Sequence, residues 1–195
     1  MTIQFNKNFL ILLFIFYPYF CLANEDISTA ENWLNNISSM TADFIQISSD
    51  GGSAEGKIYI KKDHGFRFEY LPPSPLLVVG RGNWVIVQDI VENTSNNYPL
   101  SQTPFSRFLS GNVSLTPDGY ITTSKKKGGI LEIKIVSNEK EDSYLQLDFS
   151  LNPFQLRRWV IIDQIGTEIA VMLQNHRFDV ELPAKTFRGM PIRTE

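Results

Sequence analysis

The segments of this chain that alternate like β-strands are apolar on both of their faces. In GKIYIKK, two isoleucines share one side and Tyr59 lies on the other, because strand residues two apart share a face. NWVIVQDIV likewise places Trp84, Ile86 and Ile90 opposite three valines. An antiparallel sheet with one wet face would alternate apolar and polar residues instead. Either both faces are covered, or the sheet curls so that one face encloses an interior.

The rest of the pattern predicts one long helix followed by about nine or ten antiparallel strands. Ser28 and Glu31 form a capping box, and apolar residues then recur at helical spacing as far as Met40, which predicts a helix over 29–41. The polar stretch ENTSNN is interpreted as a turn at which the chain leaves the first group of strands at Tyr98.

A short helix is predicted in the middle of the chain. Thr103 and Pro104 supply a helix start, and Gly111 supplies its end. Its apolar face consists of Phe105, Phe108 and Leu109. Further along, the run Lys125–Lys127 before two glycines predicts a solvated hairpin tip, with a contact to an acidic partner or an anionic membrane as the alternative.

Composition limits the chemistry. A length of 195 residues predicts one domain, and a net charge of -3 gives no basic footprint for nucleic acid. His64 and His176 form no pair with metal-ligand spacing, so we expect neither a metal nor another cofactor. The chain has no GxSxG motif and no recognisable carboxylate pair, which argues against an enzyme.

The first residues have the pattern of a secretory signal. One lysine precedes an apolar run over residues 9–20, which is too short to span a bilayer, and Leu22 and Ala23 follow it. Cleavage after Ala23 would remove Cys21, the only cysteine. We therefore expect 1–23 to be a signal peptide and 24–195 to be a single exported domain without a disulfide.

An apolar stripe is the strongest candidate for a functional surface. Strand periodicity allows its members to point the same way, and ordinary core is the competing interpretation. The stripe comprises Phe44, Ile58, Ile60, Phe66, Phe68, Tyr70, Trp84 and Ile86.

An ordered series of motifs resembles the outer-membrane lipoprotein carrier (LolA) family of Gram-negative bacteria. Ala42, Phe44 and Gln46 are similar to the family's A-x-F-x-Q, and the stretch from Gly56 to Tyr70, followed by LPP, keeps the family's spacing. NWVIV, YPLSQTPFSRFL, LRRWVIIDQIG and the final Phe187 fit the same series.

The resemblance implies a mainly β (α+β) fold: an unclosed antiparallel half-barrel with an N-terminal amphipathic helix and short lid helices. It implies that Phe66 and Phe68 belong to an apolar cavity for acyl chains, and that Phe105, Phe108 and Leu109 belong to the lid. The family's lid-binding Arg falls on Lys62. Lysine lacks the planar fork of arginine, so Arg67 is the alternative lid latch.

The resemblance also implies partners and a location. These are lipoproteins, an inner-membrane ABC-type release complex and an outer-membrane acceptor, met in the periplasm by a monomer without enzymatic activity. Two alternatives stay open: a module that senses lipid or lipoprotein on the same scaffold, and a periplasmic hydrolase. A closed lipocalin-like barrel is a structural variant that the Pro72-Pro73 break and the mid-chain helix disfavour.

Overall fold

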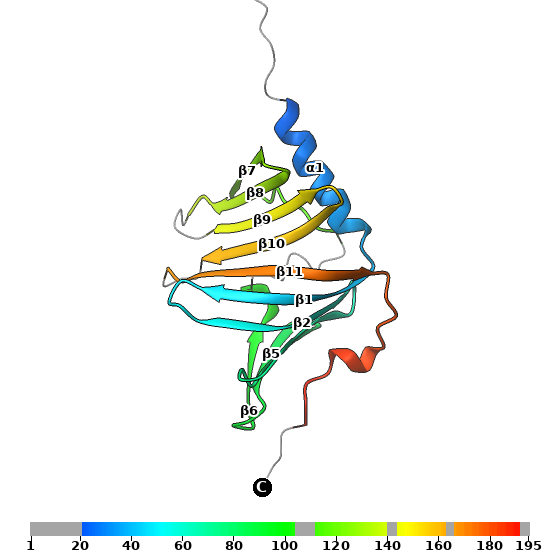
Figure 1. Cartoon of the computed structure of the whole chain (residues 1–195), viewed down its shortest axis with the longest axis vertical. Coiled ribbons are helices and arrows are strands. Elements are labelled where there is room, and N and C mark those ends of the chain that lie inside the picture. The colour runs from blue at the N-terminus through cyan, green and yellow to red at the C-terminus, as the bar shows by residue number, and fades with distance from the viewer. Residues whose placement is uncertain (1–20, 104–111, 140–143, 163–165, 192–195) are drawn as a thin grey trace, which may run out of the picture.

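One helix lies against a single antiparallel sheet that is not closed into a barrel (Figure 1). The computed structural model describes residues 21–103, 112–139, 144–162 and 166–191. Its elements are α1 (Cys21–Asn36), β1 (Ser39–Ser48), β2 (Ser53–Lys61), β3 (Gly65–Tyr70), β4 (Leu76–Arg81), β5 (Trp84–Asp89), β6 (Thr94–Pro99), η1 (Leu100–Gln102), β7 (Tyr120–Lys127), β8 (Ile130–Ser137), β9 (Tyr144–Leu151), β10 (Phe154–Ile162), β11 (Glu168–Phe178) and η2 (Ala184–Phe187). The predicted fold class is confirmed for these residues, whereas the predicted lid helix over 103–111 lies almost wholly outside them.

The first and last strands meet in the middle of the sheet. The strand order is β6-β5-β4-β3-β2-β1-β11-β10-β9-β8-β7, so only the β1–β11 pair joins segments far apart in sequence. In that pair Met40 lies opposite Phe178 and Ser48 lies opposite Ile169. This pairing joins the two runs of hairpins into one curled surface.

The predicted helix boundaries are wrong at both ends. The helix starts at Cys21 and stops at Asn36, whereas Met40 lies in β1 and pairs with Ile60 of β2. Because β1 pairs with β2 on one side and with β11 on the other, Met40 gains sheet hydrogen bonding, and this outweighs its helical spacing.

Two predicted turns are strands instead. Residues 94–99 form β6, which pairs with β5 although its first four side chains are polar and exposed. The three lysines belong to β7, and the hairpin tip is Gly128-Gly129, both at positive φ. Polar residues are common on strands at the edge of a sheet, where charged side chains also discourage pairing with another chain.

The two faces of the sheet are covered differently. The inner face packs against α1 and carries the larger core cluster, which includes Phe44, Phe149 and Ala30 of the helix. On the outer face, residues 180–191 (the C-terminal segment) run past β2–β5 and place Leu182 and Phe187 over β4. The prediction that both faces are covered is therefore confirmed for β4.

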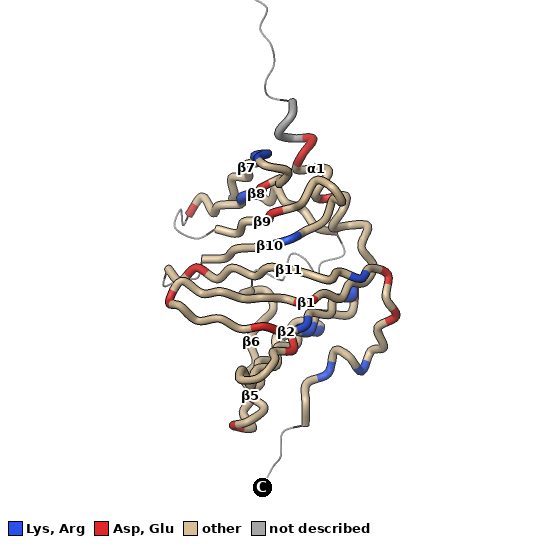
Figure 2. The backbone as a smooth tube through the Cα atoms, viewed as in Figure 1, with Lys and Arg blue, Asp and Glu red and all other residues tan. Residues whose placement is uncertain are grey.

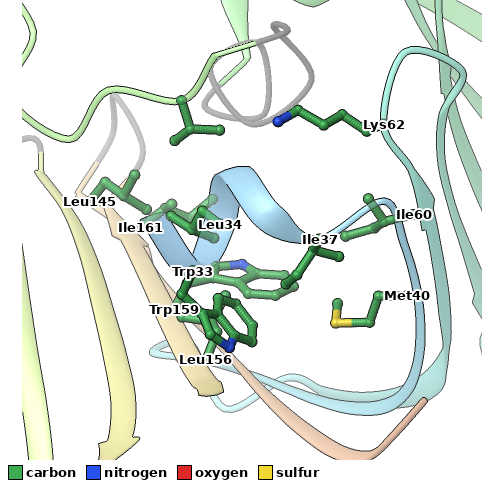
Figure 3. Close-up of a pocket in the computed structure, with 11 residues that line it drawn as sticks. Trp33, Leu34, Ile37, Met40, Ile60, Lys62, Leu145, Leu156, Trp159 and Ile161 are labelled. Atoms are coloured by element: carbon green, nitrogen blue, oxygen red, sulfur yellow. The ribbon is translucent and has the colours of Figure 1, made fainter. Parts of the chain in front are cut away.

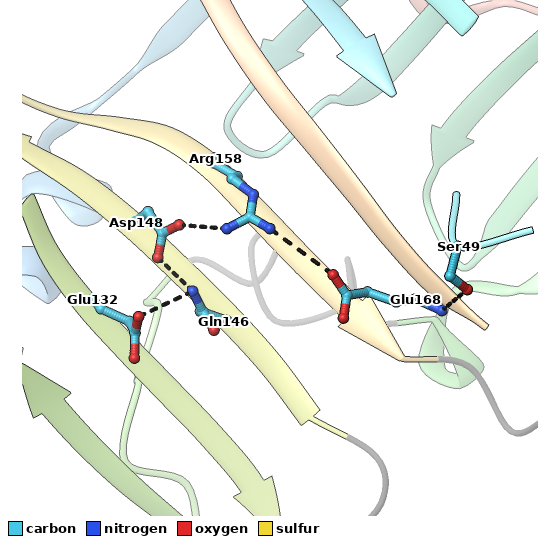
Figure 4. A network of polar contacts seen from close by, with 6 residues as sticks. All are labelled: Ser49, Glu132, Gln146, Asp148, Arg158 and Glu168. Atoms are coloured by element: carbon cyan, nitrogen blue, oxygen red, sulfur yellow. Dashed lines mark hydrogen bonds and ion pairs between the residues drawn. The ribbon is translucent and has the colours of Figure 1, made fainter. Parts of the chain in front are cut away.

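The outer face of β8 and β9 carries a polar network that extends to β10 and β11. Figure 2 marks the positions of charged residues along the backbone, including positions in β9 and β10. Asp148 bonds to Arg158 at 3.1 Å and accepts from Gln146 at 2.8 Å, and Gln146 also donates to Glu132 (Figure 4). Glu168 extends the network from β11. Within the described residues, no helix has the length and apolarity required to cross a bilayer.

Candidate functional site

A hollow lies between α1 and the inner face of the sheet. Its lining is almost entirely apolar, and Lys62 is its one charged residue (Figure 3). Trp33, Leu34 and Ile37 come from the helix. The other lining residues are Met40, Ile60, Lys62, Val113, Leu145, Leu156, Trp159 and Ile161.

The hollow is small in this form of the molecule. Its volume is about 80 Å³. For comparison, an apolar cavity of about 150 Å³ binds one benzene molecule. The helix therefore fills most of the space that the curled sheet encloses, and a larger apolar ligand would have to displace it.

Aromatic rings form the inner face beside the hollow. Phe68 makes edge-on contacts with Phe44, Phe66 and Trp159, with ring centroids 5.5, 5.6 and 6.1 Å apart. Gly56 allows this packing, since a Cβ there would lie 2.6 Å from Cε1 of Phe44. These rings form a continuous apolar surface from β1 to β10.

Six members of the predicted stripe share this inner side. Phe44, Ile58, Phe66 and Phe68 are buried in the main cluster, and Ile60 and Tyr70 pack against it. Burial raises the pKa of Tyr70, whose hydroxyl donates to Gln46 at 2.9 Å and stays neutral. Of the six, Ile60 lines the hollow itself.

Trp84 and Ile86 were placed on the wrong face. Their neighbours Val85 and Val87 pack with the inner cluster, so Trp84 and Ile86 point to the outer side. The side chain of Trp84 is 53% exposed. The residues on both faces of β5 are apolar, so the sequence alone could not show which face points inward.

Lys62 lies where the helix ends. Its ammonium donates to the carbonyl of Asn35 at 2.9 Å and reaches the side-chain oxygen of Asn35 at 3.4 Å. The side-chain amide of Asn35 also donates to the carbonyl of Val113 at 2.9 Å, and its oxygen accepts from the N–H of Val113 at 2.8 Å. Lys62 thus neutralises the negative end of the helix and supports a clamp on the chain just after residues 104–111.

A second clamp holds the same segment. Glu31, one turn earlier on α1, accepts from the backbone of Leu115 at 2.7 Å and from Ser114 at 3.4 Å. At the far end of the helix, Asp26 pairs with Lys126 of β7. Polar contacts along the helix therefore attach it to the rim of the sheet.

Arg67 lies away from this clamp. It points to the outer face, where it pairs with Glu69 at 3.4 Å and donates to the carbonyl of Arg188 at 3.2 Å. Alternation along β3 directs Phe66 and Phe68 inward and Arg67 outward, on the face opposite the hollow. The predicted lid residues Phe105, Phe108 and Leu109 lie outside the described residues.

Comparison with known proteins identifies the family. A family model described as "Outer membrane lipoprotein carrier protein LolA" matches residues 35–189. This chain belongs to the LolA family.

Relatives agree with this assignment. An uncharacterized protein of Rickettsia prowazekii is 32% identical over 160 residues, which cover 78% of this chain and 75% of that protein. An outer-membrane lipoprotein carrier protein of Legionella pneumophila is 26% identical and covers 95% of each chain. The crystal structure of an uncharacterized conserved protein from Thermus thermophilus shares the fold, with a TM-score of 0.54, 14% identity and coverage of 86% and 93%.

Much of the hollow in this LolA-family chain was not predicted from its sequence. Trp33, Leu34 and Ile37 were expected on an apolar helix face but not as lining, and the residues of β9 and β10 were missed. Alternation in FQLRRWVII indicates that Leu156 is buried, but a β-bulge between Leu156 and Arg158 shifts the register. Asn35 gives no sequence signal, because its role depends on a distant segment.

Proposed function

We propose that this protein is a periplasmic carrier that binds the acyl chains of lipoproteins and shuttles them from the inner to the outer membrane. The observation that carries this proposal is the apolar hollow between α1 and the inner face, whose one charged lining residue stands at the end of the helix. Family membership supports the same assignment.

The energetic need for such a site is large. Each buried methylene is worth about 0.8 kcal/mol, so a chain of roughly 14 methylenes exposed to water costs on the order of 11 kcal/mol. A dry cavity removes that cost during transit, and no bond has to be made or broken.

Loading requires the helix to move. As acyl chains enter, they replace the contacts that Trp33, Leu34 and Ile37 make with the sheet, so apolar area stays buried in both states. The interactions lost are polar ones, the Lys62–Asn35 contact and the Asn35–Val113 clamp. The free-energy difference between the empty and loaded states is therefore small. A small difference allows the carrier to release its cargo. We include Phe105, Phe108 and Leu109 in the moving cover.

The proposed partners follow the same scheme. An ABC-type complex at the inner membrane would supply the lipoprotein, and an acceptor at the outer membrane would receive it. The chain would act as a monomer after loss of residues 1–23, which would shorten α1 by its first residues, since the helix begins at Cys21.

Native mass spectrometry of signal-free protein mixed with a triacylated lipopeptide tests binding. Ile60→Glu places a carboxylate in the lining, and Ile86→Glu makes the same change on the outer face. We expect complexes with wild type and Ile86→Glu and loss of the complex with Ile60→Glu. Absence of a wild-type complex, or equal loading of both variants, would refute the proposal.

Transfer is tested separately. Loaded protein is mixed with vesicles that contain an outer-membrane fraction, and movement of the lipopeptide is followed. A carrier releases its cargo, whereas stable retention would favour the lipid-sensing alternative.

A further inference from the structure

The two end strands of the sheet differ in charge. β7 carries Lys125–Lys127, and α1 reaches it through the Asp26–Lys126 pair. β6, at the opposite end, has the sequence TSNNYP without a charged residue, and its positions 94–98 are exposed (Figure 1). Charged residues on an end strand prevent another strand from pairing with it, and β6 lacks that protection.

The register of β6 shows which of its backbone groups face away from the sheet. Leu100 donates to the carbonyl of Asn83 at 2.8 Å, in line with the β5–β6 pairing. Bonded and non-bonded pairs alternate in an antiparallel ladder, so residues 94, 96 and 98 bond to β5. The N–H and C=O groups of Ser95 and Asn97 then point away from β5, to an edge that no strand of the described residues covers. Pro99, which has no N–H, occupies the next outward position, where it costs no ladder bond.

Exposed aromatic side chains flank the edge on both faces. Tyr98 lies opposite Val85 on the inner side and is 48% exposed, and Trp84 lies opposite Pro99 on the outer side and is 53% exposed. Side chains of an added strand would alternate between these faces. The edge thus offers backbone groups together with apolar contact on each side.

The edge is too short to hold a free strand firmly. Each backbone hydrogen bond strengthens association by only about fivefold net. A few such bonds do not sustain a stable dimer, whose interface normally exceeds about 1,000 Å². A strand already tethered to the molecule needs much less, because its local concentration is in the millimolar range.

We propose that β6 pairs with the extended peptide segment that follows the lipid-bearing residue of a bound lipoprotein. This inference depends on the proposed function, since acyl chains in the hollow are the tether. β6 continues directly into Leu100, which packs on the same cluster as α1, so the edge adjoins the inner face. An uncharged segment rich in Ser, Thr and Val suits both the edge and its aromatic flanks.

The test compares two triacylated peptides with the same uncharged tail of six residues. One has an ordinary backbone, and the other is N-methylated at each tail amide, which removes its strand-pairing donors. Asn97→Pro removes an outward N–H from β6 without loss of a bond to β5, and Asn97→Ala is the matched control. Circular dichroism checks the fold of each variant.

We expect wild type and Asn97→Ala to bind the ordinary peptide about tenfold more tightly than the methylated one, and Asn97→Pro to bind the ordinary peptide about fivefold more weakly than Asn97→Ala does, because one hydrogen bond donated by β6 is lost. In wild type, the ordinary peptide should slow amide exchange at Ser95 and Asn97 but not at Asn96; this reading does not depend on how the proline variant folds.

Equal binding of the two peptides by wild type would overturn this inference and leave the carrier proposal intact. So would equal affinity of a folded Asn97→Pro and of Asn97→Ala for the ordinary peptide, or a dimer that the proline variant abolishes, which would assign the edge to a second copy. Failure of wild type to bind either lipopeptide would overturn the carrier proposal itself.

Discussion

The β2–β5 and β8–β10 regions bury their inner faces alike and their outer faces differently. Leu77 and Val79 on the outer side of β4 are fully buried beneath Leu182 and Phe187. The corresponding side of β8 and β9 carries Glu132, Gln146 and Asp148 in a solvent-facing network (Figure 4). In β4, apolar residues on both faces thus go with a second covering layer, which the end of the chain supplies.

The largest effect on stability is expected when the Phe187 ring, which covers β4, is removed. Phe187 is 2% exposed. We expect Phe187→Ala to lower the free energy of unfolding by about 3–5 kcal/mol, because it leaves a cavity over Leu77 and Val79. Urea denaturation followed by circular dichroism measures the loss.

The matched change in the other region is Tyr144→Ala. Tyr144 lies partly buried on the outer side of β9, and the ammonium of Lys134 lies 3.8 Å from its ring centroid. Loss of that contact should cost about 1 kcal/mol. Comparable costs for the two variants would mean that the C-terminal segment does not act as a second layer.

Two outer-face glutamines give a smaller effect of the same kind. Gln88, 4% exposed, donates to the carbonyl of Met190 at 2.9 Å and accepts from its N–H at 2.7 Å. Gln88→Ala leaves these groups without a partner and should cost about 1–3 kcal/mol. Gln146→Ala, in the open network, should cost no more than about 0.5 kcal/mol, because water replaces it. Thermal unfolding of both variants would show the difference, and equal shifts would contradict it.

The sequence predicts the two regions unequally well. In β8, Leu131, Ile133 and Ile135 alternate cleanly with polar residues, so both the strand and its inner face follow from periodicity. In β5 both parities are apolar, and the choice of Trp84 and Ile86 as inner residues was wrong. Only the C-terminal segment, distant in sequence, distinguishes the two faces.

The residues of the candidate site were likewise predictable only where polar and apolar residues alternate. Phe66 and Phe68 were expected on one face because polar Arg67 lies between them and polar Glu69 follows, and the structure places both on the inner face. The Lys62–Asn35–Val113 clamp joins a turn, a helix end and a loop from three parts of the chain. Local patterns contain no information about such contacts, so the family resemblance alone directed attention to Lys62.

The helix is attached to both regions, and the two attachments should differ in strength. Lys62 makes partly buried hydrogen bonds to Asn35, whereas the side chain of Lys126 is 52% exposed in its pair with Asp26. Lys62→Met should destabilise the docked end of α1 by about 1 kcal/mol. Lys126→Met should cost less than about 0.5 kcal/mol, since exposed pairs are screened.

Native-state hydrogen exchange at the last turn of α1 measures this difference. Amides near Asn35 should exchange about fivefold faster in Lys62→Met and remain nearly unchanged in Lys126→Met. Equal acceleration would show that the helix opens as one unit and that Lys62 is no special latch.

The smallest expected effect lies at the boundary of the two regions, in β11. Nε2 of His176 donates to the carbonyl of Leu156 at 2.9 Å, while its buried Nδ1 has no partner among the described residues. Burial lowers the pKa of His176 from 6.5; the Leu156 carbonyl opposes this shift, and Arg157 adds to it. The folded state therefore binds the proton later than the unfolded state as pH falls.

The pH dependence of stability follows from that order. Well above pH 6.5 the imidazole is neutral in both states and its contribution is constant. As pH falls below 6.5, the unfolded state is protonated first, so the free energy of unfolding declines until the folded-state pKa is passed. His176→Gln should remove this part of the decline between pH 7 and 5, measured by urea titrations at each pH, while His64→Gln at an exposed turn should retain it. If His64→Gln flattened the profile and His176→Gln did not, the buried ring would not be the group whose protonation opposes folding.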